Sequence, residues 1–150
     1  MANYSSLLLS LFTRDLNKLK DELNLYSNES NLWEVESNIS NSAGNLTLHL
    51  IGNLNHFVGS VLGHTGYVRQ RDLEFSKKDI SRAILIADIN KTIEMLTSVL
   101  GKLSNEDLDM EYAFANPDKL DVAGQFLLNL TAHLAYHLGQ INYHRRLLDK

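Results

Sequence analysis

The segment DVAGQFLLNLTAHLAYHLGQINYHRRLL, residues 121–148, carries apolar side chains at nearly every third or fourth position. This spacing matches the period of an α-helix, about 3.6 residues per turn, and predicts one long helix. Its apolar row consists of Ala123, Leu127, Leu130, Leu134, Ile141 and Leu148. The neighbouring row consists of Phe126, Leu130, His133, His137, Gln140 and His144. A partly polar row beside an apolar one is typical of a site set into the core of a helix bundle.

Three more segments with helical spacing lie upstream, and a single proline, Pro117, interrupts the chain. The predicted helices cover roughly residues 4–25, 42–62 and 76–101. The third is expected to begin at Ser76, because Ser76-Lys77-Lys78-Asp79 resembles a capping box. Trp33 lies in the polar connection after the first helix, and we expect it to pack that connection onto the helices.

The second predicted helix repeats the two-row pattern. Its apolar row consists of Leu50, Leu54, Phe57 and Val61, and its polar row of His49, Asn53, His56 and Ser60. Four predicted helices in a chain with a single proline predict an all-α fold. A chain of 150 residues suits a single domain spanning residues 1–150.

Charge and cysteine content exclude several classes of function. The net charge is −4, from 14 basic and 18 acidic residues. The sequence has no run of basic residues that would predict nucleic-acid binding. The chain has no cysteine, which excludes disulfides, thiolate metal sites and a cysteine nucleophile. Absence of cysteine fits the reducing cytoplasm, where we expect the protein. The N-terminus lacks the positive start of a signal peptide, and the apolar run 7–12 is too short for a membrane span.

The histidines at positions 133 and 137 are four residues apart. On a helix such residues lie on one face with Cβ atoms about 5–6 Å apart, so two imidazoles can bind one metal ion. His49 is the natural third ligand, since it occupies the equivalent flank of the second helix. Three nitrogen ligands with further positions open is the ligand count of a catalytic rather than a structural metal centre. Neutral imidazoles suit Zn²⁺, Ni²⁺ or Fe²⁺.

Asn53 and Gln140 lie one turn beyond His49 and His137, where they could orient the ligands. Tyr136 is a further candidate for orienting ligands or substrate. The alternative reading of the paired histidines is structural, as polar residues that fill gaps in the core through hydrogen bonds.

Other polar residues are weaker candidates. His56 and His144 lie two turns past a proposed ligand and are expected at the surface or the rim of the site. We expect His64, in a glycine loop, to be exposed. Arg69 and Arg71 could hold an anionic ligand, although a solvated loop is the commoner explanation for such residues.

The chain resembles the DinB/YfiT-like superfamily of bacterial four-helix proteins, in particular its DUF1572-type branch. The resemblance is carried by three segments, Leu48-His49-Leu50-Ile51-Gly52-Asn53-Leu54, Arg71-Asp72-Leu73-Glu74-Phe75 and His133-Leu134-Ala135-Tyr136-His137-Leu138-Gly139-Gln140-Ile141. Order and spacing agree over roughly residues 4–148.

This resemblance implies an up-down-down-up four-helix bundle, a metal held by His49, His133 and His137, and a homodimer. Some similar proteins are metal-dependent enzymes that use low-molecular-weight thiols in S-transfer or isomerisation. The leading hypothesis is therefore a thiol S-transferase with Zn or Ni, a small-molecule substrate, and neither nucleic acid nor membrane as partner. The alternatives are a non-catalytic metal- or ligand-binding module related to stress, and a plain bundle with an empty site.

Overall fold

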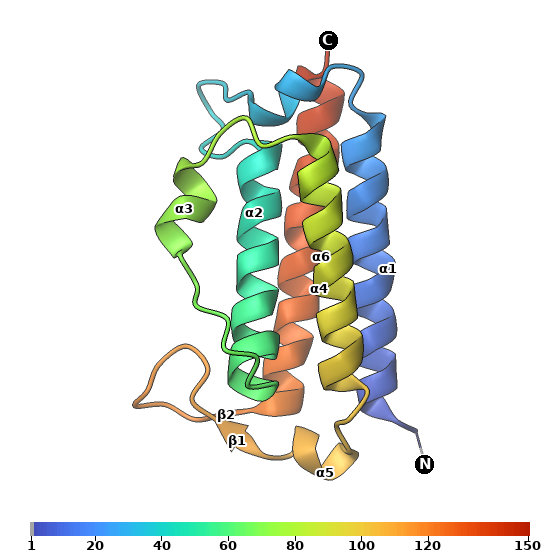
Figure 1. Ribbon diagram of the computed structural model, residues 1–150, viewed down its shortest axis with the longest axis vertical. Helices are drawn as coiled ribbons and strands as arrows, with labels where there is room; N and C mark the ends of the chain where they lie inside the picture. The colour runs from blue at the N-terminus through green and yellow to red at the C-terminus, as the bar shows by residue number, and fades with distance from the viewer. Residues whose placement is uncertain (1) are drawn as a thin grey trace.

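The computed structural model describes residues 2–150 and is built mainly from four long helices, which confirms the predicted all-α class (Figure 1). The long helices are α1 (Tyr4–Leu25), α2 (Ala43–Leu54), α4 (Arg82–Leu100) and α6 (Ala123–Leu148). Shorter elements are η1 (Glu29–Trp33), η2 (Asn55–Leu62), α3 (Arg71–Ser76), α5 (Asn105–Leu108), β1 (Glu111–Tyr112) and β2 (Asp121–Val122).

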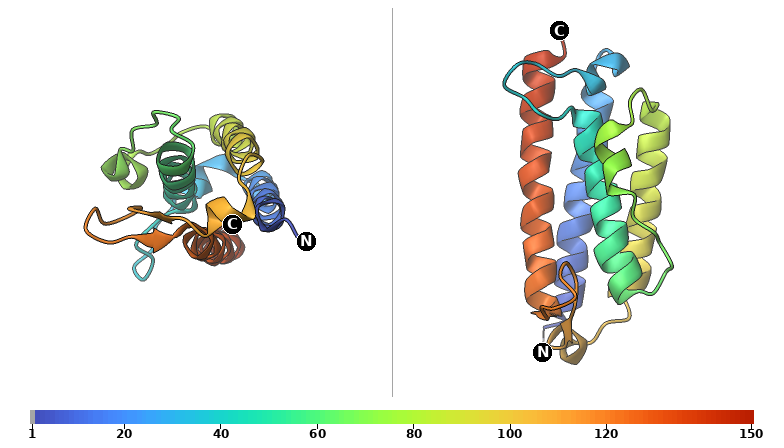
Figure 2. Two further views of the ribbon diagram at one scale, coloured as in Figure 1. Left: turned by 90° about the horizontal axis from the view of Figure 1, so that it is seen from below. Right: turned by 90° about the vertical axis from the view of Figure 1, so that its left-hand side faces the viewer.

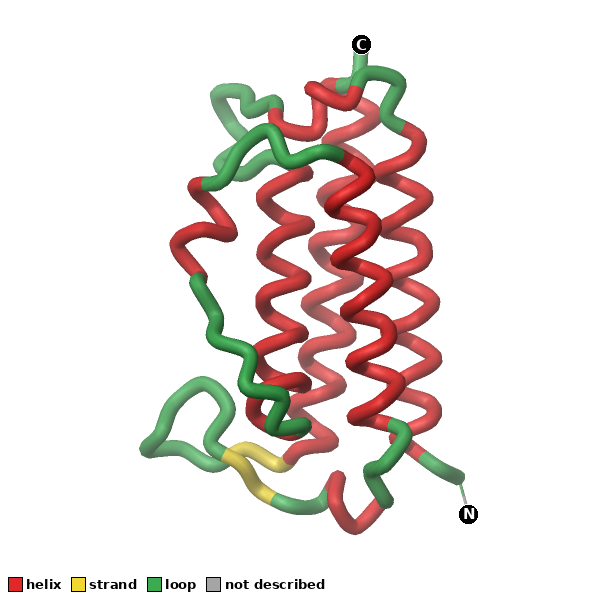
Figure 3. The backbone as a smooth tube through the Cα atoms, viewed as in Figure 1, coloured by secondary structure: helices red, strands yellow, loops and turns green. Residues whose placement is uncertain are grey.

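The four long helices lie side by side with the termini at opposite ends of the molecule (Figures 1 and 2). Helices α1 and α6 run towards the end that holds the C-terminus, whereas α2 and α4 run the opposite way. A crossover segment, residues 63–81, therefore returns along the outside of α2 and carries α3 on its way (Figure 3).

Leucine and other apolar side chains from all four long helices form one core. Fully buried members include Phe12, Leu16, Leu19, Leu23, Leu50, Leu54, Leu85, Ile89, Leu96, Leu127 and Ile141. Burying each such side chain stabilises the fold by about 1.5–3 kcal/mol relative to leaving it exposed. The apolar row predicted for residues 121–148 is buried as far as Ile141, and only Leu148 at its end is half-buried.

Helix α1 spans the residues expected for the first helix, but the expected start of the third helix at Ser76 is wrong. Ser81 is the N-cap of α4, and its side chain accepts a hydrogen bond from the backbone N–H of Ile84. Asp79 adopts a φ of 58°, in the left-handed region, which a helix through residues 76–81 cannot contain. Residues 71–76 instead form the separate short helix α3, where a connection was expected.

The second predicted helix is regular only to Leu54. From Asn55 to Leu62 the chain continues as the π-helix η2, which bonds one residue further along than an α-helix. The Asn55 side chain donates to the carbonyl of Ile51 at 2.8 Å and to Thr92 Oγ1 at 2.9 Å, and so ties this transition to α4.

The connections pack against the ends of the helices. A Cβ added to Gly44 would lie 2.6 Å from the Trp33 ring, so Trp33 packs directly on the first turn of α2, as expected. Strands β1 and β2 pair antiparallel, with Glu111 opposite Val122. This pairing makes α6 begin at Ala123 rather than at the expected Asp121.

None of the helices in residues 2–150 combines the length and the apolar character needed to cross a membrane.

Candidate metal centre

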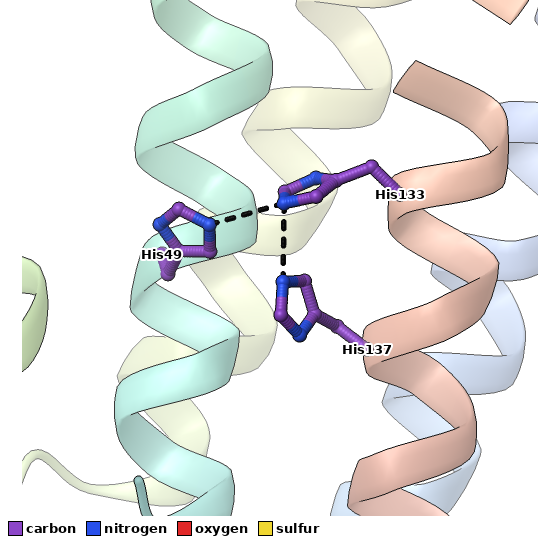
Figure 4. A group of neighbouring side chains, drawn as sticks. All are labelled: His49, His133 and His137. Atoms are coloured by element: carbon purple, nitrogen blue, oxygen red, sulfur yellow. Dashed lines mark hydrogen bonds between the residues drawn. The ribbon is translucent and has the colours of Figure 1, made fainter. Parts of the chain in front are cut away.

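The three predicted ligands come together between α2 and α6. His133 and His137 extend from successive turns of α6 towards His49 on α2 (Figure 4). The Nε2 atom of His133 lies 3.2 Å from that of His49 and 3.0 Å from that of His137. His49 is buried and the other two histidines are half-buried. One ligand nitrogen from each lies within 4.8 Å of the others, so the group could hold a metal ion.

The distances between these nitrogen atoms fit a shared cation. Two nitrogens bound to a tetrahedral zinc ion at about 2.0–2.1 Å are about 3.3 Å apart. The two short separations, 3.0 and 3.2 Å, are close to that value. Three imidazoles that turn the same kind of nitrogen towards one point form a donor set suited to a divalent metal.

The second nitrogen of His49 is engaged by an acidic residue on the crossover segment. Nδ1 of His49 lies 3.0 Å from Oε1 of Glu74, and the two side chains are nearly fully buried. A carboxylate is an acceptor, so Nδ1 carries the hydrogen and donates it, leaving the lone pair of Nε2 facing the other histidines. The Arg69 guanidinium donates two hydrogen bonds to Glu74, each of 2.8 Å.

Gln140 contacts His137 at the nitrogen that does not face the other histidines. The Nδ1 atom of His137 lies 2.7 Å from Oε1 of Gln140, and donation from Nδ1 again leaves Nε2 with its lone pair. Tyr136 contacts the His137 ring edge-on at 5.4 Å between centroids, and its own side chain is largely exposed. Gln140 is therefore hydrogen-bonded to His137, and Tyr136 lies against the edge of the His137 ring.

Asn53 and His133 each bury a polar atom that lacks a hydrogen-bond partner. Within residues 2–150, these atoms are Oδ1 of Asn53 and Nδ1 of His133. An unpaired buried polar atom is unfavourable. If Nε2 of His133 binds a metal, Nδ1 must carry the hydrogen and becomes a donor, while Oδ1 of Asn53 is an acceptor.

The surroundings favour the neutral forms of His133 and His49. Burial, with contributions from the nearby His137, His49 and Arg69, lowers the pKa of His133 to about 4. Burial also lowers the pKa of His49, although Glu74 opposes this effect. A neutral imidazole is the form that binds a metal, so these shifts favour metal binding by His133 and His49.

His64 is exposed, as expected, whereas His56 is half-buried. The His56 ring packs against Phe57, with ring centroids 4.8 Å apart. Burial is the main cause of its lowered pKa, followed by the charge of Arg69. His64 is exposed and has a φ of 50°.

The expectation of a surface or rim position for His144 is wrong. Its side chain is buried, with Nδ1 2.7 Å from the Tyr26 hydroxyl and Nε2 2.9 Å from the carbonyl of Glu34. The cause is the connection after α1, which folds over the end of α6 and supplies both partners. His144 therefore fastens this connection to the bundle.

Sequence reasoning missed Glu74 and assigned Arg69 to a solvated loop. Glu74 is only 6% exposed and lies 25 positions from His49, on a segment expected to be a connection. Arg69 is half-buried because it pairs with Glu74. The available signal was the mixture of charged and apolar residues in 71–75, which is unusual for a freely solvated loop. Arg71 is exposed and stacks over Phe75.

Comparison with known proteins places the chain in a family without assigning its chemistry. No curated protein matches the sequence. The family model described as "Protein of unknown function (DUF1572)" matches residues 2–150, which is nearly the whole chain. This match covers α2, α6 and the crossover segment, and therefore every residue of the candidate centre. The chain belongs to the DUF1572 family.

Proposed function

We propose that this protein is a divalent-metal-dependent enzyme of the DinB-like type that transfers the sulfur of a low-molecular-weight thiol to an electrophile. The observation that carries the proposal is the convergence of three imidazoles. Nε2 of His133 lies 3.2 Å from Nε2 of His49 and 3.0 Å from Nε2 of His137. His49, His133 and His137 would hold the ion, and Zn²⁺ or Ni²⁺ suits these ligands. Gln140 and Asn53 would orient them.

A divalent ion held there would lower the pKa of a bound thiol and favour the nucleophilic thiolate at neutral pH. In the transfer, the thiol proton passes to solvent and an S–C bond forms at the electrophilic carbon. The leaving group departs with its bonding electrons. The chain itself supplies no cysteine, so the sulfur must come from a bound small molecule.

A cavity next to His137 supports a small-molecule substrate. It has a volume of about 520 Å³ and lies between α6 and the connection at residues 38–41. His137, Gln140, Tyr136 and Tyr143 line it, and its described lining contains no Asp, Glu, Lys or Arg. The cavity thus offers polar but uncharged groups to the part of the substrate that does not react.

The course of the long helices supports the DinB-like part of the proposal. Helices α1 and α6 run one way and α2 and α4 the other, with the crossover between α2 and α4 (Figure 1). This is the order expected for an up-down-down-up four-helix bundle. A homodimer located in the cytoplasm belongs to the same proposal.

The test is an activity screen of metal-loaded protein with a panel of low-molecular-weight thiols and a chromogenic aryl halide. We expect product in the parent and in His64→Asn, which removes an exposed histidine and keeps a residue suited to positive φ. We expect no product above background in His137→Ala. Turnover in the parent no greater than in His137→Ala would refute the enzymatic proposal.

The alternative function is a non-catalytic metal-binding module. It requires only the three-histidine group that could hold a metal ion, and no substrate. This alternative predicts that the melting temperature depends on metal and that the protein turns over none of the thiols.

A further inference from the structure

The buried carboxylate of Glu74 uses both of its oxygen atoms. Oε1 accepts from Nδ1 of His49 at 3.0 Å and from the Arg69 guanidinium at 2.8 Å, while Oε2 accepts from Nε of Arg69 at 2.8 Å. Since Arg69 and His49 together occupy the carboxylate, Glu74 is placed to act through His49 and not as a fourth metal ligand.

We propose that Glu74 is the positioning residue of the metal centre, and that Arg69 and Gly52 hold it in the required place. The inference rests on the proposed metal site. Glu74 determines which nitrogen of His49 carries the hydrogen, and so keeps the lone pair of Nε2 directed at His133 and His137.

The tautomer of His49 matters because a neutral imidazole has one donor nitrogen and one acceptor nitrogen. A hydrogen on Nε2 would point at the neighbouring ligands and block coordination. The Glu74 carboxylate can only accept, so it selects the tautomer with the hydrogen on Nδ1. Arg69 can only donate, and its two hydrogen bonds to Glu74 prevent the carboxylate from rotating away. Nη2 of Arg69 also lies 3.4 Å from Nδ1 of His49, farther than Oε1 of Glu74 at 3.0 Å, so the carboxylate is the nearer partner of that nitrogen.

The backbone of α2 is shaped to admit this carboxylate. A Cβ on Gly52 would lie 2.6 Å from Cδ of Glu74 and would collide with Oε2 as well. Gly52 is one turn beyond His49 and leaves the space through which Glu74 reaches the ring. Asn45 fixes the segment from the other side, because its amide donates to the carbonyls of Glu74 and Lys77, both at 2.9 Å.

Two substitutions test the placement by different routes. Glu74→Gln replaces one carboxylate oxygen by an NH₂ group. Both oxygens of Glu74 accept from Arg69, so in either orientation the NH₂ group of the glutamine faces an Arg69 donor and the hold on Nδ1 of His49 is weakened. Gly52→Ala leaves Glu74 intact and pushes it off the ring. We expect each variant to bind Zn²⁺ about 10–100-fold more weakly than the parent, as measured by competition with a chromogenic chelator.

Matched controls separate this effect from general damage. Glu94→Gln removes an exposed carboxylate on α4. Gly139→Ala adds a methyl group on α6 where nothing lies within 4 Å. Both controls are expected to bind Zn²⁺ as the parent does. Zinc affinity of Glu74→Gln and Gly52→Ala equal to that of the parent would overturn the proposal.

A second measurement needs no metal. In ¹⁵N NMR of the metal-free protein, we expect the parent to show His49 with its hydrogen on Nδ1, and Glu74→Gln to show a smaller share of that tautomer. A parent with the hydrogen on Nε2 would contradict the proposal even if no metal bound. If the parent binds Zn²⁺ in this Glu74-dependent way but turns over no thiol, only the enzymatic proposal fails.

Discussion

The Nε2 atoms of His133 and His137 lie 3.0 Å apart on successive turns of α6. Two neutral imidazoles can share this contact only if one of them supplies a hydrogen to the other. A metal ion between them removes the need for that hydrogen, because both nitrogens then present lone pairs to the ion. We therefore expect metal to stabilise the native protein strongly.

That stabilisation can be measured by thermal melting with and without Zn²⁺. A ligand that binds only the native state at 100 times its Kd adds about 2.7 kcal/mol, which raises Tm by roughly 5–11 °C for a protein of this size. The His133→Ala/His137→Ala double variant is the control and should melt at one temperature regardless of metal. Equal shifts in parent and double variant would mean that the ion binds elsewhere.

The lowered pKa of His133 predicts how the metal-free protein responds to acid. Its pKa is about 4 in the folded protein, mainly through burial, against about 6.5 in the unfolded chain. Between these values the unfolded state binds more protons, so the free energy of unfolding falls as pH falls through this window. Urea unfolding near pH 7 and near pH 5 should show this loss. His133→Gln should show a smaller one, and an identical pH dependence in the variant would exclude His133 as its source.

The buried pair of His144 and Tyr26 predicts a stability effect that leaves the metal centre untouched. Tyr26→Phe removes the hydroxyl that lies 2.7 Å from Nδ1 of His144 and leaves that nitrogen unpaired. Loss of a buried partner costs about 1–3 kcal/mol. Urea unfolding should detect it, whereas Tyr143→Phe, on an exposed side chain, should be neutral. A large drop in zinc affinity of Tyr26→Phe would show that this pair supports the site after all.

Local patterns in the sequence were sufficient for most of the helices and for the group of three histidines that could hold a metal ion. The bounds of α1 follow from its leucine spacing, and the separation of His133 from His137 already places both rings on one face. His49 was found because it lies on the polar row of a second amphipathic helix. These inferences succeed because each depends on residues within a few turns of one another.

Local sequence patterns could not predict the contacts between segments that are far apart in the chain. Glu74 reaches His49 only because the crossover segment lies against α2, and His144 is buried only because the connection after α1 covers the end of α6. Ser76 and Ser81 both offer a hydroxyl for capping, and the left-handed backbone at Asp79 decides between them. Each of these outcomes depends on tertiary packing that helical periodicity does not encode.

The most direct test of the metal centre is elemental analysis of untagged protein beside the His133→Ala/His137→Ala variant. We expect close to one equivalent of Zn or Ni per chain in the parent and none in the variant. Absence of metal from the parent, even after reconstitution, would contradict this expectation and leave three histidines held together by hydrogen bonds alone.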